Sequence, residues 1–351
     1  MHNLKRKIYP GNVTGLFVII ALTIILLSGC TIKPEATGQE NSLCILIDPE
    51  LRDSIENTLL QVFCPIIETP QPERRFNPVF AGMDEIANVQ TSRNLLIVAV
   101  LNQSGPVSQL VFNMLSPEIV QGVSNGEYFV FSKENEWAKD QQMMILVMAD
   151  PASMISQLQE EGGELFSIFD DVRTQKVKKD LYRRHEQKKL AADVRERYGF
   201  DMRIPHDYYI VREEQDDGWL RLKRGLAPGR WITLWKSEPL LANPVDTSWV
   251  YQTWSMLAAS FADTVQANLD YLHFKEIEVA GLPALEMWGL WETKGPQGGG
   301  PFVCRAFFNP NDKRAYLIEG EVFFPRGEKE PFLRQVEVIL STFKVDNNNI
   351  Y

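Results

Sequence analysis

Residues 95–101 form an unbroken run of seven apolar side chains, and this run constrains the fold more than any other segment. A strand without alternating polar residues is covered on both faces, as central strands of α/β sheets are. Residues 43–47 form a second apolar run, and a helical pattern that begins near Pro49 follows it. The first part of the chain is therefore predicted to be an α/β domain.

A long helical segment is predicted for residues 150–198. Asp150 is typical of a helix start, because an aspartate side chain accepts hydrogen bonds from the free N–H groups of the first turn. Gly162 and Gly163 are predicted to interrupt the segment, and Gly199 is predicted to end it as a C-cap. This would be the long helix of the first domain.

Residues 173–197 within this segment carry ten basic and four acidic side chains, although the formal net charge of the chain is −10. A solvated helix face explains such a run most simply, and contact with a partner or a lipid headgroup is the alternative. The acidic balance of the whole chain argues against a general nucleic-acid binder, which needs a basic surface.

The second half of the chain has shorter apolar segments that alternate with turn residues, which is typical of hairpins. Two helices are predicted among these strands, from the apolar spacing of residues 250–269 and 332–343. The predicted fold class is α+β, with two α/β domains, the second a mostly antiparallel sheet covered by two helices. The predicted strands are residues 207–213, 219–223, 230–236, 273–280, 284–292, 301–309 and 314–324.

The N-terminus has the three parts of an export signal: a basic start, a twelve-residue apolar run at 16–27 broken only by Thr23, and small residues after it. The run is shorter than the ~20 residues of a membrane-spanning helix. The sequence Leu27-Ser28-Gly29-Cys30 resembles the bacterial lipobox. That resemblance implies removal of residues 1–29 and attachment of acyl chains, including palmitate, to Cys30.

The export signal predicts where the mature chain begins and in which compartment the protein lies. A lipidated Cys30 would begin a flexible tether at 30–42, followed by an N-terminal α/β domain at 43–200, a C-terminal α+β domain at 201–345 and a tail at 346–351. The expected location is the cell envelope, on the outer membrane facing the periplasm. The membrane would be contacted through the N-terminal lipid.

Cys44 and Cys64 are the candidates for a disulfide, because an exported protein meets an oxidising compartment. A strand followed by a helix that folds back over it could bring the two thiols together. The alternative is two buried thiols that act as small apolar residues. No C-x-x-C spacing is present, and no metal site or cofactor is predicted.

Ser124 stands in a G-x-S-x-G sequence, which is the pattern of a hydrolase nucleophile. A nucleophile elbow needs a strand before the serine and a helix after it, whereas here a strand is predicted after it. A hydrolase that uses Ser124 is therefore an unlikely alternative, and we expect a protein without enzymatic activity.

Tryptophan is the unusual feature of the second half, since seven of the eight tryptophans lie between Trp219 and Trp291. Residues of equal parity on a strand share a face, and those of opposite parity do not. Glycines allow a ligand to approach the backbone closely. A small-ligand or glycan surface is one interpretation, and a tryptophan-filled core is the other. The candidate surface comprises Trp231, Trp235, Trp291, Gly299 and Gly300.

Several short motifs together resemble those of the family named domain of unknown function (DUF) 4837, which contains bacterial lipoproteins. The resemblance extends over about residues 43–345 and implies an uncharacterised, membrane-anchored lipoprotein without an assigned reaction. A non-catalytic binding or assembly component of the envelope, with a protein or glycan partner, is the leading hypothesis. The motifs are Thr91-x-Arg93-Asn94, Tyr198-Gly199 with Pro205 and Tyr208, Gly289-Leu290-Trp291, Gly299-Gly300-Pro301-Phe302-Val303 and Leu333-Arg334-Gln335-Val336.

Overall fold

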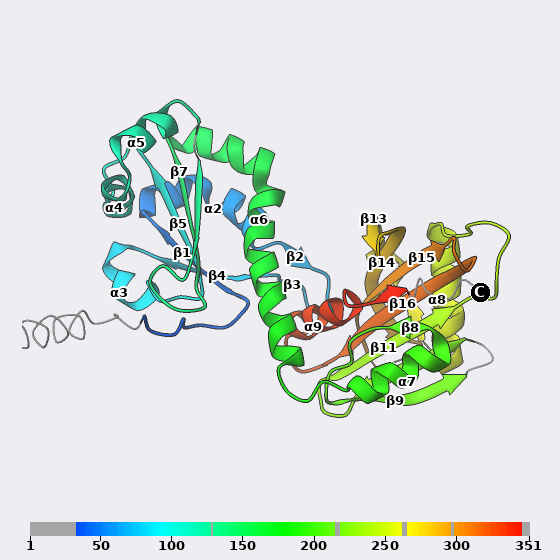
Figure 1. Ribbon diagram of the computed structural model, residues 1–351. Coiled ribbons are helices and arrows are strands. Elements are labelled where there is room, and N and C mark those ends of the chain that lie inside the picture. The colour runs from blue at the N-terminus through cyan, green and yellow to red at the C-terminus, as the bar shows by residue number, and fades with distance from the viewer. Residues whose placement is uncertain (1–32, 128, 215–217, 262–264, 296–297, 346–351) are drawn as a thin grey trace, which may run out of the picture.

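The computed structural model describes residues 33–127, 129–214, 218–261, 265–295 and 298–345. The predicted signal peptide at 1–29, Cys30 and the tail at 346–351 lie outside the described residues. Figure 1 shows two lobes, with the long helix α6 (Pro151–Tyr182) running from one to the other. The predicted fold class of two mixed α and β domains is confirmed. Among the described residues, no helix is long and apolar enough to cross a bilayer.

A five-stranded sheet with the order β4-β1-β5-β7-β6 forms the centre of the N-terminal domain. All its strands are parallel except β6, which runs antiparallel to β7. Every residue of β5 is buried, which confirms that the apolar run is a central strand. The strands are β1 (Ser42–Ile47), β4 (Asn77–Ala81), β5 (Asn94–Val100), β6 (Val130–Glu134) and β7 (Gln142–Met148).

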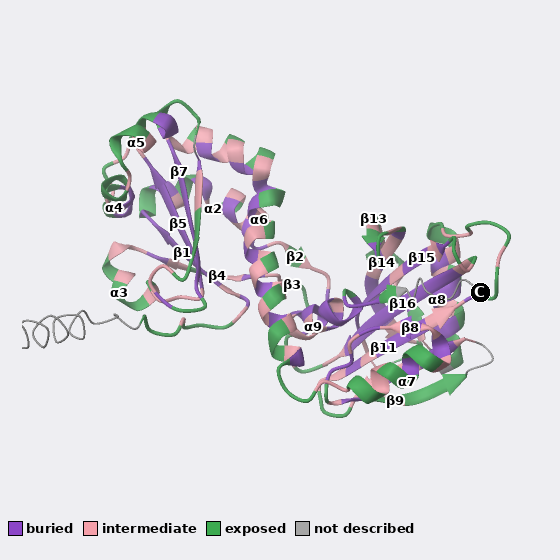
Figure 2. Cartoon of the chain, in the orientation of Figure 1, coloured by how far each residue is buried: buried purple, intermediate pink, exposed green. Residues whose placement is uncertain are grey.

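Helices cover both faces of this sheet, and Figure 2 shows its strands as mostly buried. On one face α2 and α6 surround a core that includes Leu51 and Phe169, and on the other α3, α4 and α5 surround one that includes Ile97. A small hairpin of β2 (Ile66–Ile67) and β3 (Glu73–Arg74) precedes β4. The remaining bounds are α2 (Pro49–Phe63), η1 (Met83–Glu85), α3 (Ile86–Val89), α4 (Pro106–Met114) and α5 (Pro117–Ser124).

The predicted break at the glycine pair is wrong, because α6 runs without interruption through Gly162 and Gly163. Gly162 is buried where α6 packs on α2, and a Cβ atom there would lie 2.7 Å from Cγ2 of Val62. A Cβ at Gly163 would meet nothing within 4 Å. Packing against α2 therefore holds the helix together despite the low helix propensity of glycine.

Alanine at these two positions is expected to have opposite effects on stability. Gly163→Ala should raise the free energy of unfolding by about 0.5–1 kcal/mol, because alanine favours the helix and meets no obstruction. Gly162→Ala should lower it by about 1–3 kcal/mol, because the new methyl group overpacks the contact with Val62. Urea denaturation measures both changes, and shifts of the same sign would contradict this account of the packing.

The disulfide considered above does not form, because Cys44 and Cys64 are separate buried thiols. Cys44 belongs to the core under α3, α4 and α5, whereas Cys64 belongs to the core on the opposite face of the sheet. Burial raises the pKa of Cys44 to about 11 and that of Cys64 to about 12. Both therefore act as small apolar residues.

The predicted tether is shorter than residues 30–42, because its second part is bound to the N-terminal domain. The N–H of Ala36 donates to the carbonyl of Lys139 at 2.9 Å, and the N–H of Thr37 donates to that of Thr91 at 2.8 Å. Lys139 in turn donates to the carbonyl of Pro34 at 2.8 Å. The backbone of residues 34–37 thus pairs with two loops, which a search for apolar periodicity does not detect.

An antiparallel sheet forms the C-terminal domain, with the order β12-β14-β15-β16-β11-β10-β9 and with β13 also paired to β14. The seven strands predicted from sequence are all present. They are β9 (Tyr208–Glu214), β10 (Trp219–Arg224), β11 (Gly229–Lys236), β13 (His273–Val279), β14 (Leu282–Thr293), β15 (Gly299–Asn309) and β16 (Arg314–Phe323), and β12 (Val265–Ala267) joins them.

Helices cover both faces of the second sheet as well (Figure 1). One face carries α7 (Lys188–Tyr198) and α9 (Glu330–Leu340), with the pair β8 (Phe200–Asp201) and β17 (Lys344–Val345) beside them. The other face carries α8 (Thr247–Phe261).

The helical pattern predicted for residues 250–269 extends too far. Val265 lies in β12 and is paired with Thr293 of β14, and Leu269 begins the short helix η2 (Leu269–Tyr271). The apolar residues three and four positions apart favour a helix here, but the backbone of residues 265–267 pairs with β14 as an edge strand.

The boundary predicted between residues 200 and 201 lies too late in the chain. Val194 and Tyr198 of α7 are buried in the core of the C-terminal domain, so α7 belongs to that domain. The transition falls in the residues between α6 and α7, where His185 adopts a positive φ of 51°. Helical character alone does not show which of two domains buries a helix.

Buried ion pairs join the two domains where α6 meets α9. Arg173 donates to both carboxylate oxygens of Glu330, at 2.8 and 2.6 Å, and both side chains are 1% exposed. Arg75 binds Glu337 in the same two-pronged manner, at 2.9 and 2.6 Å. Burial alone would raise the pKa of Glu337, but Arg75 and Arg334 outweigh it and lower the value to about 2. The solvated-face interpretation therefore does not hold for Arg173.

Candidate functional site

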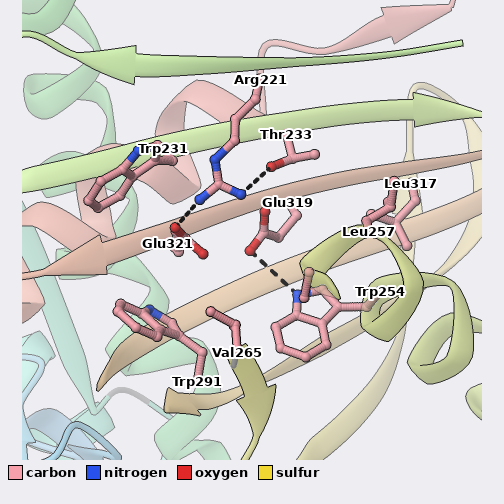
Figure 3. A pocket seen from close by; sticks show the side chains of 11 residues that line it. Arg221, Trp231, Thr233, Trp254, Leu257, Val265, Trp291, Leu317, Glu319 and Glu321 are labelled. Carbon is pink, nitrogen blue, oxygen red and sulfur yellow. Dashed lines mark hydrogen bonds and ion pairs between the residues drawn. The ribbon is translucent and has the colours of Figure 1, made fainter. Parts of the chain in front are cut away.

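A cavity of about 260 Å³ lies between α8 and the antiparallel sheet. Figure 3 shows its tryptophans arranged around two carboxyl groups and a guanidinium group. Its apolar walls come from α8, β11, β12, β14 and β16, and its charged groups come from β10 and β16. The lining residues are Arg221, Trp231, Thr233, Trp254, Leu257, Ala258, Val265, Trp291, Leu317, Glu319 and Glu321.

Strand register brings the polar groups of this cavity together. Arg221 on β10 is paired with Thr233 on β11, and Thr233 is paired with Glu319 on β16. Trp231 and Glu321 form the next cross-strand pair two residues away. Because side chains two residues apart share a face, all five project toward α8.

Arg221 and Glu321 form an ion pair across β11, with side chains 11% and 10% exposed. The guanidinium group of Arg221 also lies 3.5 Å from the hydroxyl of Thr233. Charge-assisted contacts of this kind fix both side chains and leave the second oxygen of Glu321 to accept a hydrogen bond. The pair therefore adds polarity to the cavity and little net charge.

Glu319 is the buried acid of the cavity, and it is only 3% exposed. Its pKa is raised to about 8, first by burial and then by the charge of Glu321, against the opposing effect of Arg221. The indole N–H of Trp254 lies 3.4 Å from one of its oxygens. At neutral pH Glu319 is thus mostly an uncharged carboxylic acid that can donate one hydrogen bond.

Trp291 supplies an unused hydrogen-bond donor. Its side chain is buried, with a residue exposure of 9%, and no acceptor for its indole N–H is found among the described residues. A buried donor of this kind normally has a partner, because leaving it without one costs about 1–3 kcal/mol. A ligand in the cavity could supply the missing acceptor.

The predicted candidate surface divides between two cavities. Trp231 and Trp291 line the cavity under α8, whereas Trp235 lines a separate cavity of about 420 Å³ with Trp219 and Met256. Trp231 and Trp235 are half-buried, so these side chains remain accessible. A small-ligand or glycan site therefore stays a hypothesis for Trp231 and Trp291, which line the same cavity.

Gly299 and Gly300 have a different role from the one predicted, because neither lines the cavity. A Cβ atom at Gly300 would lie 1.9 Å from the carbonyl oxygen of Val322, and one at Gly299 would lie 2.4 Å from that of Trp291. These glycines allow neighbouring strands to approach each other.

The charged residues of this cavity were not predicted from the sequence. Glu319 and Glu321 are themselves buried on β16, where the buried residues Leu317 and Ile318 precede them. Two acids on the buried side of an apolar strand are unusual and could have marked the site. Which arginine faces them depends on strand order, which sequence alone does not provide.

Ser124 is not placed as a hydrolase nucleophile. It ends α5, and its hydroxyl donates to the carbonyl of Val120 at 2.9 Å, one turn earlier in the same helix. A helix precedes it, where a nucleophile elbow requires a strand. Among the described residues, no group of three or more His, Cys, Asp or Glu side chains is arranged to hold a metal ion.

Two solved structures to which this chain is similar are distant likenesses. LpqN of Mycobacterium tuberculosis, described as involved in cell envelope biogenesis, is 14% identical, with a TM-score of 0.28 over 42% of this chain and 82% of its own. The Ran-binding protein Mog1p of Saccharomyces cerevisiae is 11% identical, with a TM-score of 0.29 over 42% of this chain and 90% of its own. Likenesses this low transfer no function.

Comparison with protein families divides the chain in two. A model of the domain of unknown function DUF4837 matches residues 186–342, and a model of a second one, DUF8532, matches residues 36–182. No curated protein matches the chain. The first match confirms the family resemblance over a shorter range than residues 43–345, and the two matches meet where α6 ends. The C-terminal domain therefore matches the DUF4837 family, and it follows a domain that matches the DUF8532 family.

Proposed function

We propose that this protein is a lipid-anchored component of the bacterial envelope that binds a small ligand in the cavity under α8. The unpartnered indole N–H of Trp291 is the observation that carries the binding proposal. Tryptophan walls with a few convergent polar groups are typical of small-molecule sites. The proposed role is binding without chemistry, on the periplasmic side of the outer membrane.

The short N-terminal segment supports a close attachment to the membrane. Three residues lie between Cys30 and Pro34, the first described residue whose backbone pairs with the N-terminal domain, so four residue-to-residue steps join the two. Four fully extended steps of about 3.6 Å reach about 14 Å at most. A lipid on Cys30 would therefore hold the N-terminal domain beside the bilayer, where the ligand or partner would be another envelope component.

Cys30→Ser is expected to release the protein from membranes, because the acylated thiol would be its attachment. Cell fractionation measures the distribution, and most of the variant should move from the membrane pellet to the soluble fraction. Ser42→Ala, which leaves the lipobox intact, is the control and should stay in the pellet. A Cys30→Ser variant that sediments with membranes as wild type does would contradict the anchor.

Filling the cavity is expected to abolish ligand binding. Ala258 lines the cavity, whereas the neighbouring Ala259 on α8 is exposed. Ala258→Phe should therefore block binding, and Ala259→Phe, the same change one residue along, should preserve it. Ligand-observed NMR with a small-molecule library measures binding, and circular dichroism checks the fold. Hits that bind wild type and Ala258→Phe equally would place binding elsewhere, and a wild-type protein that binds nothing would refute the function.

A further inference from the structure

We propose that the cavity under α8 binds a single uncharged ring that carries hydroxyl groups, as a sugar does. The indole N–H of Trp291 donates a hydrogen bond to one oxygen substituent of that ring. This inference rests on the proposed function and names its ligand class. The walls, the polar groups and the size of the cavity each support it.

The aromatic walls are held in place by neighbouring rings. Trp254 stacks on Phe302 with ring centroids 4.7 Å apart, and Trp291 packs against Phe323 at 5.9 Å. Fixed tryptophan rings favour a ligand with a flat apolar face, because little side-chain entropy is lost on binding. The C–H face of a pyranose ring is such a surface.

The polar groups require a ligand that both accepts and donates hydrogen bonds. The N–H of Trp291 lacks an acceptor among the described residues, and the neutral acid of Glu319 offers an O–H donor. The carboxylate of Glu321 offers an acceptor beside them. Hydroxyl groups satisfy both kinds of partner, whereas an ammonium group has no lone pair for Trp291.

The charges around Glu319 disfavour an ionised ligand. Glu321 lies on the same strand, Arg221 projects from β10, and the buried Cys304 is paired with Glu319 from β15. The residues that α8 contributes are Trp254, Leu257 and Ala258, which carry no charge. An anion would meet the carboxylate of Glu321, and a cation would compete with its partner Arg221. A ligand of either charge would lose its hydration in the cavity, and it would gain no opposite charge there, because Arg221 and Glu321 already neutralise each other.

The size of the cavity limits the ligand to about one ring. Its volume of about 260 Å³ lies just below the ~300–1,000 Å³ of pockets for drug-sized ligands. A long glycan could enter only with a terminal residue. The structure therefore favours a monosaccharide or the end of a chain.

Isothermal titration calorimetry on the wild-type protein tests this inference. The probes are sugars that have the same type of ring but differ in charge. Glucose, galactose and N-acetylglucosamine are the neutral probes, and glucosamine and glucuronate are the charged ones, each at pH 6.5. At least one neutral sugar is expected to bind, and the charged pair at least tenfold more weakly. Equal or tighter binding of a charged sugar would overturn the inference.

Two variants test the named contacts. Trp291→Phe is expected to weaken neutral-sugar binding about tenfold, whereas Trp288→Phe, the same change on the opposite face of β14, should leave it unchanged. Wild-type affinity should fall as pH rises through about 8, where Glu319 loses its proton, and Glu319→Gln should remove this fall. Affinity unaffected by Trp291→Phe would overturn the contact with the ligand oxygen.

Failure of this inference can be separated from failure of the proposed function. If no neutral sugar binds at 10 mM but another small molecule binds wild type and not Ala258→Phe, the ligand class is wrong and the binding function stands. If no molecule of either kind binds, both are refuted.

Discussion

Arg173→Ala is expected to lower the free energy of unfolding by about 3–5 kcal/mol, because it leaves the buried carboxylate of Glu330 without its principal partner. Both side chains are 1% exposed, and two hydrogen bonds of 2.8 and 2.6 Å join them across the domain boundary. Arg75, 3.6 Å from Glu330, compensates only in part because it also binds Glu337. Urea denaturation followed by circular dichroism measures the loss.

Arg52→Ala is the matched control, since it removes an arginine from an exposed pair with Glu56 on α2. The side chains of that pair are 40% and 33% exposed. Exposed pairs contribute about 0–1 kcal/mol, so this variant should unfold close to wild type. A loss below 1 kcal/mol for Arg173→Ala would show that the pair does not hold the domains together.

Glu319→Gln is expected to stabilise the protein increasingly as the pH rises from about 5 to about 8. Burial and the charge of Glu321 raise the pKa of Glu319 in the folded state to about 8, well above its unfolded value. The folded protein therefore binds more protons in this range, and the wild type loses stability as pH rises. One proton changes the free energy of unfolding by at most about 1.4 kcal/mol per pH unit.

Urea denaturation of the wild type and the variant at pH 5, 6, 7, 8 and 9 measures this difference. It should grow with pH and level off above about 8. Glu238→Gln is the control, because the side chain of Glu238 is 82% exposed and its replacement should give a nearly constant difference. A constant difference for Glu319→Gln would mean that the carboxyl group is ionised in the folded protein throughout this range.

Local sequence patterns predicted most elements of the fold. The seven strands of the second half were found because polar and apolar residues alternate between turn residues, and β5 was found because it has no polar residue at all. The patterns failed where packing decided the outcome. The helix α6 continues through Gly162 because that residue packs against Val62 of α2. Val265 lies in a strand because its backbone pairs with the edge of β14.

The candidate site was predicted only in part. Trp231 and Trp291 were chosen for their type and position, and they do line one cavity. Trp235 shares a strand with Trp231 but lines another cavity, because the position of α8 divides that face of the sheet. The acids on β16 and the arginine on β10 were not predicted, since they are 98 or more residues apart and meet only through β11.

The sequence by itself determined the two kinds of domain, the strands of the second sheet and the lipobox pattern, because each depends on neighbouring residues or on a short period. Only the tertiary structure decided that Cys44 and Cys64 stay apart, that Arg173 is buried against Glu330, and that Glu319 and Trp291 line the same cavity. Those outcomes depend on strand order and on the closeness of distant segments. Burial then sets the charge of the groups that meet there.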